Sequence, residues 1–517
     1  MKSKFAGLQK KFTNWRKSFG VEINSHLALY IILVFIFITA FFVRVYRVGD
    51  LMWFYYDQGR DALRIWEFWH QGKPFLVGPV TGLAGIFLGP FYYYLIAPFY
   101  LLGGGNPVYP AVFLAFLSTI ALAPLYILGW KMHSRATGLI ATIIVGFSYY
   151  LVLAGRWLAN PTPILLTSIL LLFSMWRISL GKNKYWWLVI TLLIGISLQL
   201  EAASAVFYLP MILIFAVWQR KNLPNVKTAV VLGILFLVTL LPQIVFDFRH
   251  EHILLNNFKR VLLEEKSFRT PLYSVLDTRL RYFWNVYNSK IFPGREGYAK
   301  LFTTVSLIAL ISSFKKKKTP LTLLIIFLGI PMLGYIFFQG NFGNIYDYYM
   351  TGYFLPMMLL LSLGFGILWE DKLGKIAVTA FFVLFLMINV TNLKNYLIAG
   401  VDGPTHITLG NEKQAVNWIF DDAGKKRLQE FNVETYVPPV ISHSYDYLYL
   451  WLGTKRCGKG LCGLVKDRNT EIFYALYEVD PPHPERLAEW LGRYGNSTII
   501  EEQEKFGGIT VERRKRI

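Results

Sequence analysis

The feature that most constrains the fold is a series of long apolar runs separated by short segments rich in Lys and Arg. Runs such as Leu27 to Val43 and Thr228 to Phe246 are long enough to cross a hydrocarbon layer roughly 30 Å thick. With 54% hydrophobic and 16% charged residues and a mean hydropathy of +0.41, the chain is too apolar for ordinary globular domains. The sequence therefore predicts an α-helical polytopic membrane protein.

The formal net charge of +21 comes mainly from these short segments, and positive charge so placed orients helices in a bilayer. A nucleic-acid partner is therefore not expected. Five segments are predicted to lie inside: those beginning at Lys131, Lys182, Arg220, Lys315 and Lys372. The basic residues 1–26 are also predicted to be cytoplasmic. No small-residue cleavage pattern follows the first apolar run, so we expect that helix to remain and act as the insertion signal.

The segments poor in Lys between these basic segments are predicted to lie outside. The alternation gives about eleven crossings if Leu88 to Gly103, interrupted by Pro90 and Pro98, is re-entrant or interfacial. The predicted organisation is a cytoplasmic N-terminus 1–26, a transmembrane module 27–246 with first outer loop 44–85, a large outer loop 247–300 with interfacial helices, transmembrane helices 301–394, and a small extracytoplasmic α/β domain 395–517. This places a multi-pass protein in the plasma membrane with its C-terminal domain outside.

The first outer loop contains the sequence FYYDQGRDALR, at residues 54–64. If this stretch is helical, spacings of three and four residues place four charged side chains on one face: Asp57, Arg60, Asp61 and Arg64. Solvated ion pairs on a helix surface are the simpler interpretation. A charged platform beside a membrane instead predicts a functional site.

Other candidates on the outer side are Arg156, Asn160, Glu201, Arg249, His250 and Tyr346. Arg156 either contacts a phosphate or caps a helix C-terminus. Arg249 and His250 contact either a donor phosphate or lipid headgroups in general. Glu201 lies between two apolar runs, where an acidic group is costly without a partner or a function, although a place in the turn would also accommodate it.

Cys457 and Cys462 are the only cysteines, and they stand five residues apart in RCGKGLCG. Glycines around them permit a tight loop, so a disulfide is predicted outside the cytoplasm. A metal site needs more than two thiols, and no His is close in sequence. We therefore predict no metal at this position.

The outer groups suit a reaction that needs a carboxylate base, cations beside a phosphate leaving group and access to a lipid-borne substrate. Transfer of a sugar from a polyprenyl phosphate meets each requirement. No Walker, GxGxxG, GxSxG or HExxH motif stands where it would function, so nucleotide cofactors are not expected. The alternatives are a polysaccharide polymerase or ligase, and a flippase for lipid-linked glycans, although no internal repeat supports the flippase.

The chain resembles the GT-C superfamily of membrane glycosyltransferases, especially bacterial relatives of protein O-mannosyltransferases and of the lipid A aminoarabinose transferase (glycosyltransferase family 39-like). Three segments within roughly residues 20–395 carry the resemblance: YYDQGRDA (55–62), GPFYYYLIAP (89–98) and RWLANP (156–161). The resemblance implies the GT-C fold with about 11 to 13 transmembrane helices. It also implies inverting transfer from a polyprenyl phosphate sugar to a hydroxyl or amine of a glycan, lipid or protein acceptor.

The resemblance further implies that Asp57 is the catalytic base. Many relatives have two adjacent acidic residues at this site, whereas Gln58 follows Asp57 here, so a second carboxylate would come from Asp61 or elsewhere. Asn160 occupies a position that is often acidic, which weakens the case for metal binding. No cofactor is certain, and two nearby carboxylates are compatible with a divalent cation without requiring it.

Overall fold

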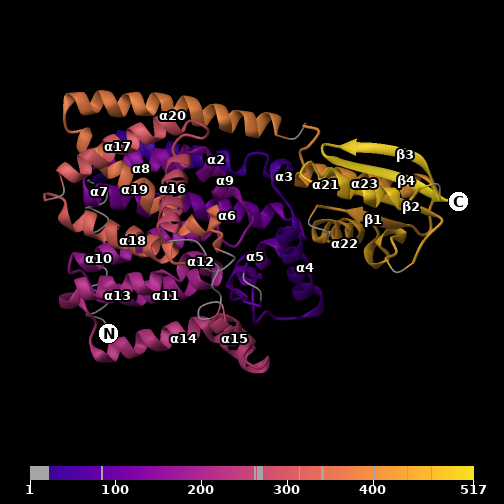
Figure 1. The fold of residues 1–517 in the computed structure, drawn as a ribbon, viewed down its shortest axis with the longest axis horizontal. Helices are drawn as coiled ribbons and strands as arrows, with labels where there is room; N and C mark the ends of the chain where they lie inside the picture. The colour runs from indigo at the N-terminus through magenta and orange to yellow at the C-terminus, as the bar shows by residue number, and fades with distance from the viewer. Residues whose placement is uncertain are drawn as a thin grey trace.

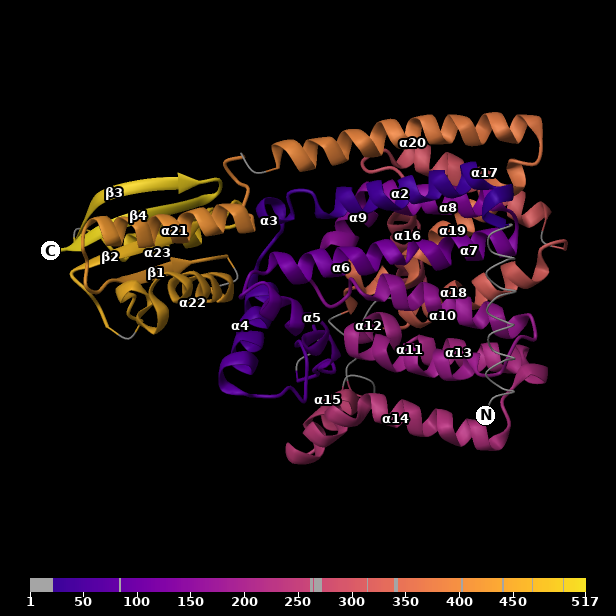
Figure 2. The same cartoon turned by 180° about the vertical axis from the view of Figure 1, so that it is seen from behind.

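The computed structural model describes residues 22–82, 85–260, 264, 272–313, 315–338, 343–400, 403–438, 441–466, 468–495 and 497–517. A bundle of helices forms most of the elongated molecule, and a small α/β domain extends from one end of it (Figures 1 and 2). The long helices lie along the long axis of the molecule in both views. The basic residues before Glu22 lie outside the described residues.

The bundle follows the predicted apolar runs closely. Its helices are α2 (Leu27–Val45), α6 (Val108–Ile120), α7 (Leu122–Met132), α8 (Arg135–Phe147), α9 (Tyr149–Arg156), α10 (Ile164–Ser179), α11 (Trp186–Leu200), α12 (Ala202–Ala205), α13 (Tyr208–Trp218), α14 (Val226–Arg249), α17 (Glu296–Ser312), α18 (Lys318–Ile336), α19 (Thr351–Leu368) and α20 (Lys372–Ala399), with the short 3-10 turn η1 (Arg220–Asn222) after α13. The mostly helical fold with several apolar helices is as predicted.

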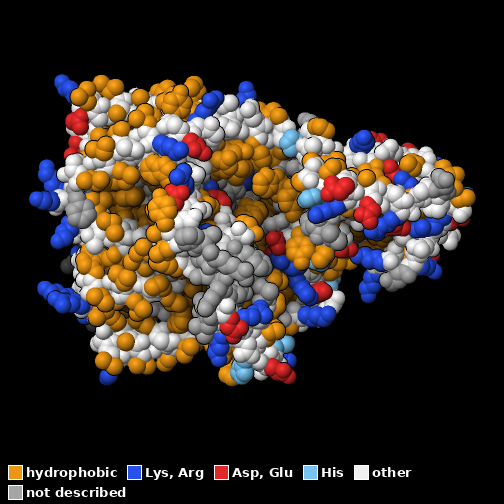
Figure 3. All heavy atoms as spheres, in the orientation of Figure 1, with side chains coloured by type: hydrophobic (Ala, Val, Ile, Leu, Met, Phe, Trp, Pro, Cys, Tyr) orange, Lys and Arg blue, Asp and Glu red, His pale blue; other side chains and the backbone are white. Residues whose placement is uncertain are grey.

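Six of the described helices are long and apolar enough to cross a membrane, or seven if α8 and α9, bent by 67°, form one broken span. Helices α10, α11 and α13 are apolar but shorter. The count of about eleven crossings therefore stays a prediction. Helix α14 buries none of its residues, and hydrophobic side chains cover the flank of the bundle (Figure 3). A helix that exposes Val, Leu and Ile in this way is suited to lipid rather than water. The chain is a multi-pass membrane protein.

The end of the bundle nearest the α/β domain carries shorter elements. These are α3 (Val48–Leu51), α4 (Tyr56–Gln71), α5 (Phe91–Leu102), α15 (Ile253–Lys259) and the 3-10 turn η4 (Asp347–Met350). The longer helix α16 (Leu272–Ser289) lies within the bundle and packs on α17 and α18. Figure 2 shows α4 and α5 side by side at this end. The 12 residues of α5 span about 18 Å, which is too short for the hydrocarbon layer. Helix α13 is just as short, so the re-entrant or interfacial interpretation of Leu88 to Gly103 stays a prediction.

The C-terminal domain has the predicted α/β composition. Its four-stranded sheet has the order β1-β2-β4-β3, with β1 (Asn432–Tyr436) parallel to β2 (Ile472–Glu478), and with β3 (Thr498–Phe506) and β4 (Ile509–Arg516) antiparallel to their neighbours. The pairing places Asn432 opposite Phe473 and Phe506 opposite Ile509. Helices α21 (Leu409–Lys425), α22 (His443–Cys457) and α23 (Pro484–Gly492) and the turn η5 (Gly458–Gly463) complete the domain.

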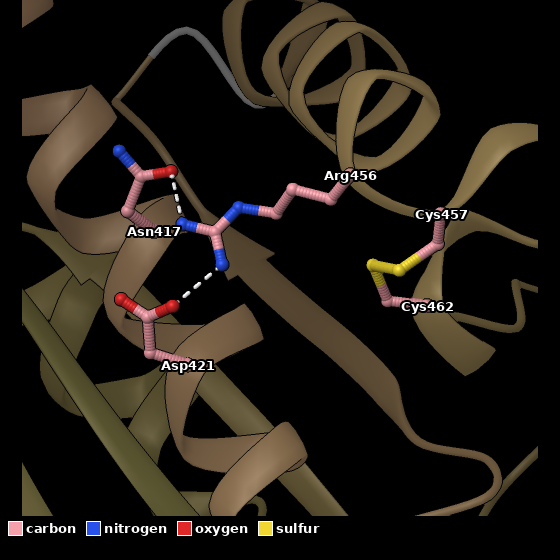
Figure 4. The surroundings of a disulfide bond; sticks show 5 residues. All are labelled: Asn417, Asp421, Arg456, Cys457 and Cys462. Atoms are coloured by element: carbon pink, nitrogen blue, oxygen red, sulfur yellow. Dashed lines mark hydrogen bonds and ion pairs between the residues drawn. A yellow bond between two sulfur atoms is a disulfide. The ribbon is translucent and has the colours of Figure 1, made fainter.

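A disulfide joins Cys457 to Cys462 and closes the turn after α22, with the two Cα atoms 5.2 Å apart (Figure 4). The neighbouring Arg456 reaches α21, where its guanidinium lies 2.5 Å from Asp421 Oδ1 and donates to Asn417 Oδ1 at 2.9 Å (Figure 4). Arg456 therefore fixes the C-terminal end of α22 against α21, and the disulfide closes the turn that follows α22.

We expect the double substitution Cys457→Ser/Cys462→Ser to lower the free energy of unfolding of this domain by about 2 kcal/mol, because an open loop restores entropy to the unfolded chain. Thermal unfolding of the full-length protein measures the change, with proteolysis of the C-terminal domain at each temperature as the readout. The parent protein under reductant is the matched control and should show the same shift. Unchanged melting in both samples would contradict a stabilising role for the disulfide.

The α/β domain is joined tightly to α3, α4 and the turn after α5. Trp451 Nε1 donates to Gly104 O at 2.8 Å, and Tyr447 Oη donates to Gly105 O. The Leu409 amide donates to Met52 O at 2.9 Å. The domain therefore holds the end of the bundle that contains α4.

Candidate active site

A cavity of 840 Å³ is lined on one side by residues of α4. Its polar lining comes from α4, from the loop after α9 and from the junction of α11 and α12: Asp57, Gln58, Arg60, Asp61, Asn160 and Glu201. Its apolar lining comes mainly from the residues between α12 and α13, from α14 and from the residues after α18: Val206, Phe207, Phe236, Leu240, Phe337 and Phe338. The fold thus brings the predicted first-loop site and the RWLANP segment together.

Arg60 bridges the two carboxylates of α4. Its Nη1 lies 2.9 Å from Asp57 Oδ1, while Nε and Nη2 donate to Asp61 Oδ1 at 3.0 and 2.8 Å. The Asp57 side chain is 63% exposed, whereas that of Asp61 is 6% exposed. Asp57 can therefore contact a substrate in the cavity, while Asp61 is buried behind Arg60.

Tyr93 on α5 completes the site around Asp61, to which its hydroxyl donates at 2.9 Å. Burial raises the pKa of Asp61 to about 6, although the Arg60 guanidinium acts in the opposite direction. Asp61 therefore changes its protonation near neutral pH. Only the charged carboxylate holds Arg60 with a full ion pair.

Gln58 occupies the position where many relatives have a second acidic residue. It is buried, its Oε1 accepts from the Tyr55 amide at 3.0 Å, and its Nε2 donates to Leu158 O at 3.1 Å. A carboxylate could not make the second bond because it has no N–H to donate. The Gln58 side chain therefore links the start of α4 to the loop after α9.

Asn160 and Glu201 meet at the cavity wall. Asn160 Nδ2 donates to Leu200 O at 2.7 Å and lies 3.3 Å from Glu201 Oε2. Glu201 Oε1 accepts from the Ala203 amide at 3.2 Å, which caps the N-terminus of α12. Glu201 therefore both holds the turn and lines the cavity.

Other predicted binding residues do not line this cavity: Arg64, Arg156, Arg249, His250 and Tyr346. Arg64 pairs with Glu67 at 3.0 Å on the solvent side of α4. For Arg64 the simpler interpretation, a solvated ion pair on the helix surface, therefore fits. Arg249 and His250 are exposed at the C-terminal end of α14. Tyr346 is also exposed, and it stacks on Tyr348, with ring centroids 5.6 Å apart. No contact in the cavity therefore supports substrate binding by these residues.

Arg156 caps a helix, although a different one from the helix expected. Its Nη2 donates to Tyr46 O at 3.0 Å and its Nη1 to Val43 O at 3.4 Å, at the C-terminal end of α2. The last carbonyl groups of a helix have no intrahelical donors and favour a cation. The alternative of a phosphate contact in the large cavity has no support.

Metal binding has little support among the residues that the structure describes, where no three His, Cys, Asp or Glu side chains are grouped to hold an ion. Asp57 and Asp61 both line the cavity, and Arg60 lies between them. A guanidinium at that point would oppose a divalent cation.

Comparison with known proteins identifies the class of fold. A family model described as dolichyl-phosphate-mannose-protein mannosyltransferase matches residues 88–246. Apo ArnT from Cupriavidus metallidurans has 10% identity and a TM-score of 0.59, with 95% of this chain and 98% of ArnT covered. ArnT from the same organism bound to undecaprenyl phosphate has 12% identity and a TM-score of 0.56, with 93% of this chain and 98% of ArnT covered. No curated protein sequence matches the chain.

The two comparisons agree: residues 88–246 are similar to a mannosyltransferase family, and the fold of the whole chain is similar to that of ArnT, as expected for the GT-C superfamily. The match to the mannosyltransferase family runs from α5 almost to the end of α14 and so includes the cavity walls formed by α11, α13 and the RWLANP loop. The resemblance inferred from the three sequence segments is confirmed at the level of the superfamily.

Proposed function

We propose that the protein transfers a sugar from a polyprenyl phosphate to a hydroxyl or amine of an acceptor on the outer face of the membrane, with inversion. One observation carries the proposal: the cavity joins the charged groups of α4 to an apolar wall formed by α13, α14 and α18. A polyprenyl phosphate sugar has the same division between a polar head and an apolar chain. The likeness of the fold to ArnT, solved with undecaprenyl phosphate, agrees with this choice.

The donor is accommodated as follows. Phe236 and Leu240 belong to α14, whose remaining surface is exposed and apolar, so the prenyl chain can extend from the cavity toward lipid. Arg60 is the only cation among the described residues that line the cavity, and its Nη1 lies on the side of Asp57. We assign the donor phosphate to the neighbourhood of Arg60.

The reaction uses Asp57 as general base. The acceptor oxygen or nitrogen attacks the anomeric carbon, its proton passes to Asp57, and the bond from that carbon to the phosphate oxygen breaks with its electron pair going to the phosphate. Charge grows on the leaving phosphate in the transition state, where Arg60 stabilises it. Asp61 and Tyr93 hold the guanidinium of Arg60 and so act as positioning residues.

The proposed orientation places the N-terminus inside and the α/β domain outside. Lys and Arg side chains gather at the end of the bundle farthest from the α/β domain (Figure 3), and cytoplasmic loops are rich in these residues. The cavity and α4 then lie at the outer face. The disulfide agrees with this side, because disulfides persist outside the cytoplasm.

Release of polyprenyl phosphate by the purified full-length protein in detergent tests the proposal. A panel of polyprenyl phosphate sugars is supplied, first alone and then with membrane glycolipids, glycans or proteins as acceptors. We expect release from at least one donor, faster when an acceptor is present. Tight binding of a donor without release under any condition would overturn transfer and favour transport of the lipid-linked sugar.

We expect kcat/KM to fall as the pH is lowered through about 6, because protonation of Asp61 removes the ion pair that positions Arg60. The rate above this pH should level off, since the carboxylate is then charged. Asp61→Asn should remove this limb of the pH profile. Glu67→Gln on the same helix should retain it. A limb that persists unchanged in Asp61→Asn would assign the titration to another group.

A further inference from the structure

A second cavity, which we call the aromatic pocket, lies next to the candidate active site. Its volume is 320 Å³, within the range of roughly 300–1,000 Å³ found for small-molecule sites. Aromatic rings form much of its wall: Trp53, Tyr150, Trp157, Tyr348, Phe354 and Tyr396. Its polar groups include Arg156, Lys290 and Asp347. The mechanism above uses none of these residues.

Lys290 and Asp347 form an ion pair at the pocket wall. The Lys290 ammonium lies 2.9 and 2.8 Å from the two carboxylate oxygens and 4.6 Å from the centre of the Phe354 ring. The Lys290 side chain is 5% exposed, whereas that of Asp347 is 57% exposed. Because the Asp347 carboxylate is largely exposed, it keeps acceptor positions open to a ligand.

Arg156 adds a donor to the same pocket. The residue is 3% exposed, its terminal nitrogens are bonded to carbonyl groups of α2, and its Nε–H has no acceptor among the residues that the structure describes. A buried donor without a partner costs free energy unless a ligand or water supplies one. The pocket therefore presents an exposed acceptor on Asp347, and the buried guanidinium of Arg156 forms part of its wall.

These groups favour a neutral polyhydroxyl ligand. A hydroxyl can donate to the exposed carboxylate of Asp347, whereas a phosphate would place like charge beside that carboxylate. A pyranose ring also has hydroxyls at its edge and C–H groups on its faces, which suit a pocket with aromatic walls. Trp53 leaves 48% of its surface exposed and offers such a wall.

The aromatic pocket and the large cavity share two walls. Trp157 and Tyr348 line both cavities, and their ring centroids lie 6.3 Å apart. A ligand in the pocket is therefore separated from the cavity that contains Asp57 by side chains rather than by backbone. The aromatic pocket therefore adjoins the cavity that Asp57 lines.

We propose that the aromatic pocket binds an uncharged pyranose ring of the acceptor, which makes the acceptor a glycan or glycolipid. This proposal rests on the transferase function proposed above, because an acceptor is needed only if a sugar is transferred. Binding in the pocket can nevertheless be measured without turnover.

Saturation-transfer NMR on the full-length protein in detergent tests binding directly. The probes are methyl β-D-glucopyranoside, methyl α-D-mannopyranoside and the anionic methyl β-D-glucuronide. Two variants remove pocket groups: Trp53→Ala removes an exposed ring, and Lys290→Gln/Asp347→Asn removes both charges so that neither is left buried alone. Asp277→Asn is the matched control, since it breaks a partly exposed pair with Arg281 on α16, away from the pocket lining.

We expect signal from at least one neutral glycoside, with affinity reduced at least about tenfold in both pocket variants and unchanged in Asp277→Asn. The same variants should raise the KM for a glycan acceptor. No signal in the parent, signal from the glucuronide alone, or full binding in both variants would each overturn the proposal. Glycoside binding that depends on the pocket in a protein that releases no polyprenyl phosphate would instead overturn the transferase function and leave the pocket as a saccharide site.

Discussion

Asp57→Asn is expected to reduce polyprenyl phosphate release by about three orders of magnitude, within the range that general-base catalysis contributes. The amide has nearly the same shape but cannot accept the proton of the attacking group. Because the Asp57 side chain is largely exposed and Asp61 keeps its bonds to Arg60, the variant should fold normally. Steady-state release with saturating donor, together with a separate measurement of donor binding, checks the result.

The matched control for Asp57→Asn is Glu67→Gln, which makes the same kind of change to an ion-paired residue of α4 outside the cavity. It should retain nearly full activity. Equal turnover in Asp57→Asn and the parent would show that the base is a different group, and Glu201 would then be the next carboxylate to test because it also lines the cavity.

Gly59→Ala is expected to destabilise the junction between α4 and the α/β domain by roughly 1–3 kcal/mol, as overpacking usually does. A Cβ atom at this position would lie 2.3 Å from the Ser444 amide nitrogen and 2.4 Å from the His443 carbonyl carbon. These are backbone atoms at the start of α22, so no side chain can rotate away. Alanine favours a helix by about 1 kcal/mol over glycine, so the expected loss runs against intrinsic propensity.

Two measurements check the Gly59→Ala prediction: the melting temperature of the full-length protein and the rate at which protease releases the C-terminal domain. Gly424→Ala, within α21, is the control because a Cβ atom there would meet nothing within 4 Å. Its stability should stay the same or rise. If Gly59→Ala melted at or above the temperature of the parent, the close packing of α4 against α22 would not hold in solution.

The sequence was sufficient to place the helices and the first-loop site because both depend on local patterns. Apolar runs of the right length became helices within a few residues of the predicted bounds, as Thr228 to Phe246 did in α14. Spacings of three and four on α4 brought Asp57, Arg60 and Asp61 together, because a helix fixes those neighbours whatever surrounds it.

Contacts between distant segments were not accessible in the same way. Gln58 looked like a departure from a catalytic pair, but its function is to reach Leu158, one hundred residues later. Arg156 was expected at a phosphate or at the end of its own helix, and it caps α2 instead. The sequence does not show which tyrosine of α5 contacts Asp61. The packing of α5 on α4 shows that it is Tyr93.

The close contact of Gly59 with His443 and Ser444 has a consequence for the order of biosynthesis. Helix α4 is made early, but the backbone that fixes it belongs to α22, which the ribosome makes after every helix of the bundle. We therefore expect a newly inserted chain to hold its bundle in the membrane before its reactive carboxylate is correctly placed. Activity would then appear only after the α/β domain has crossed the membrane, folded and docked.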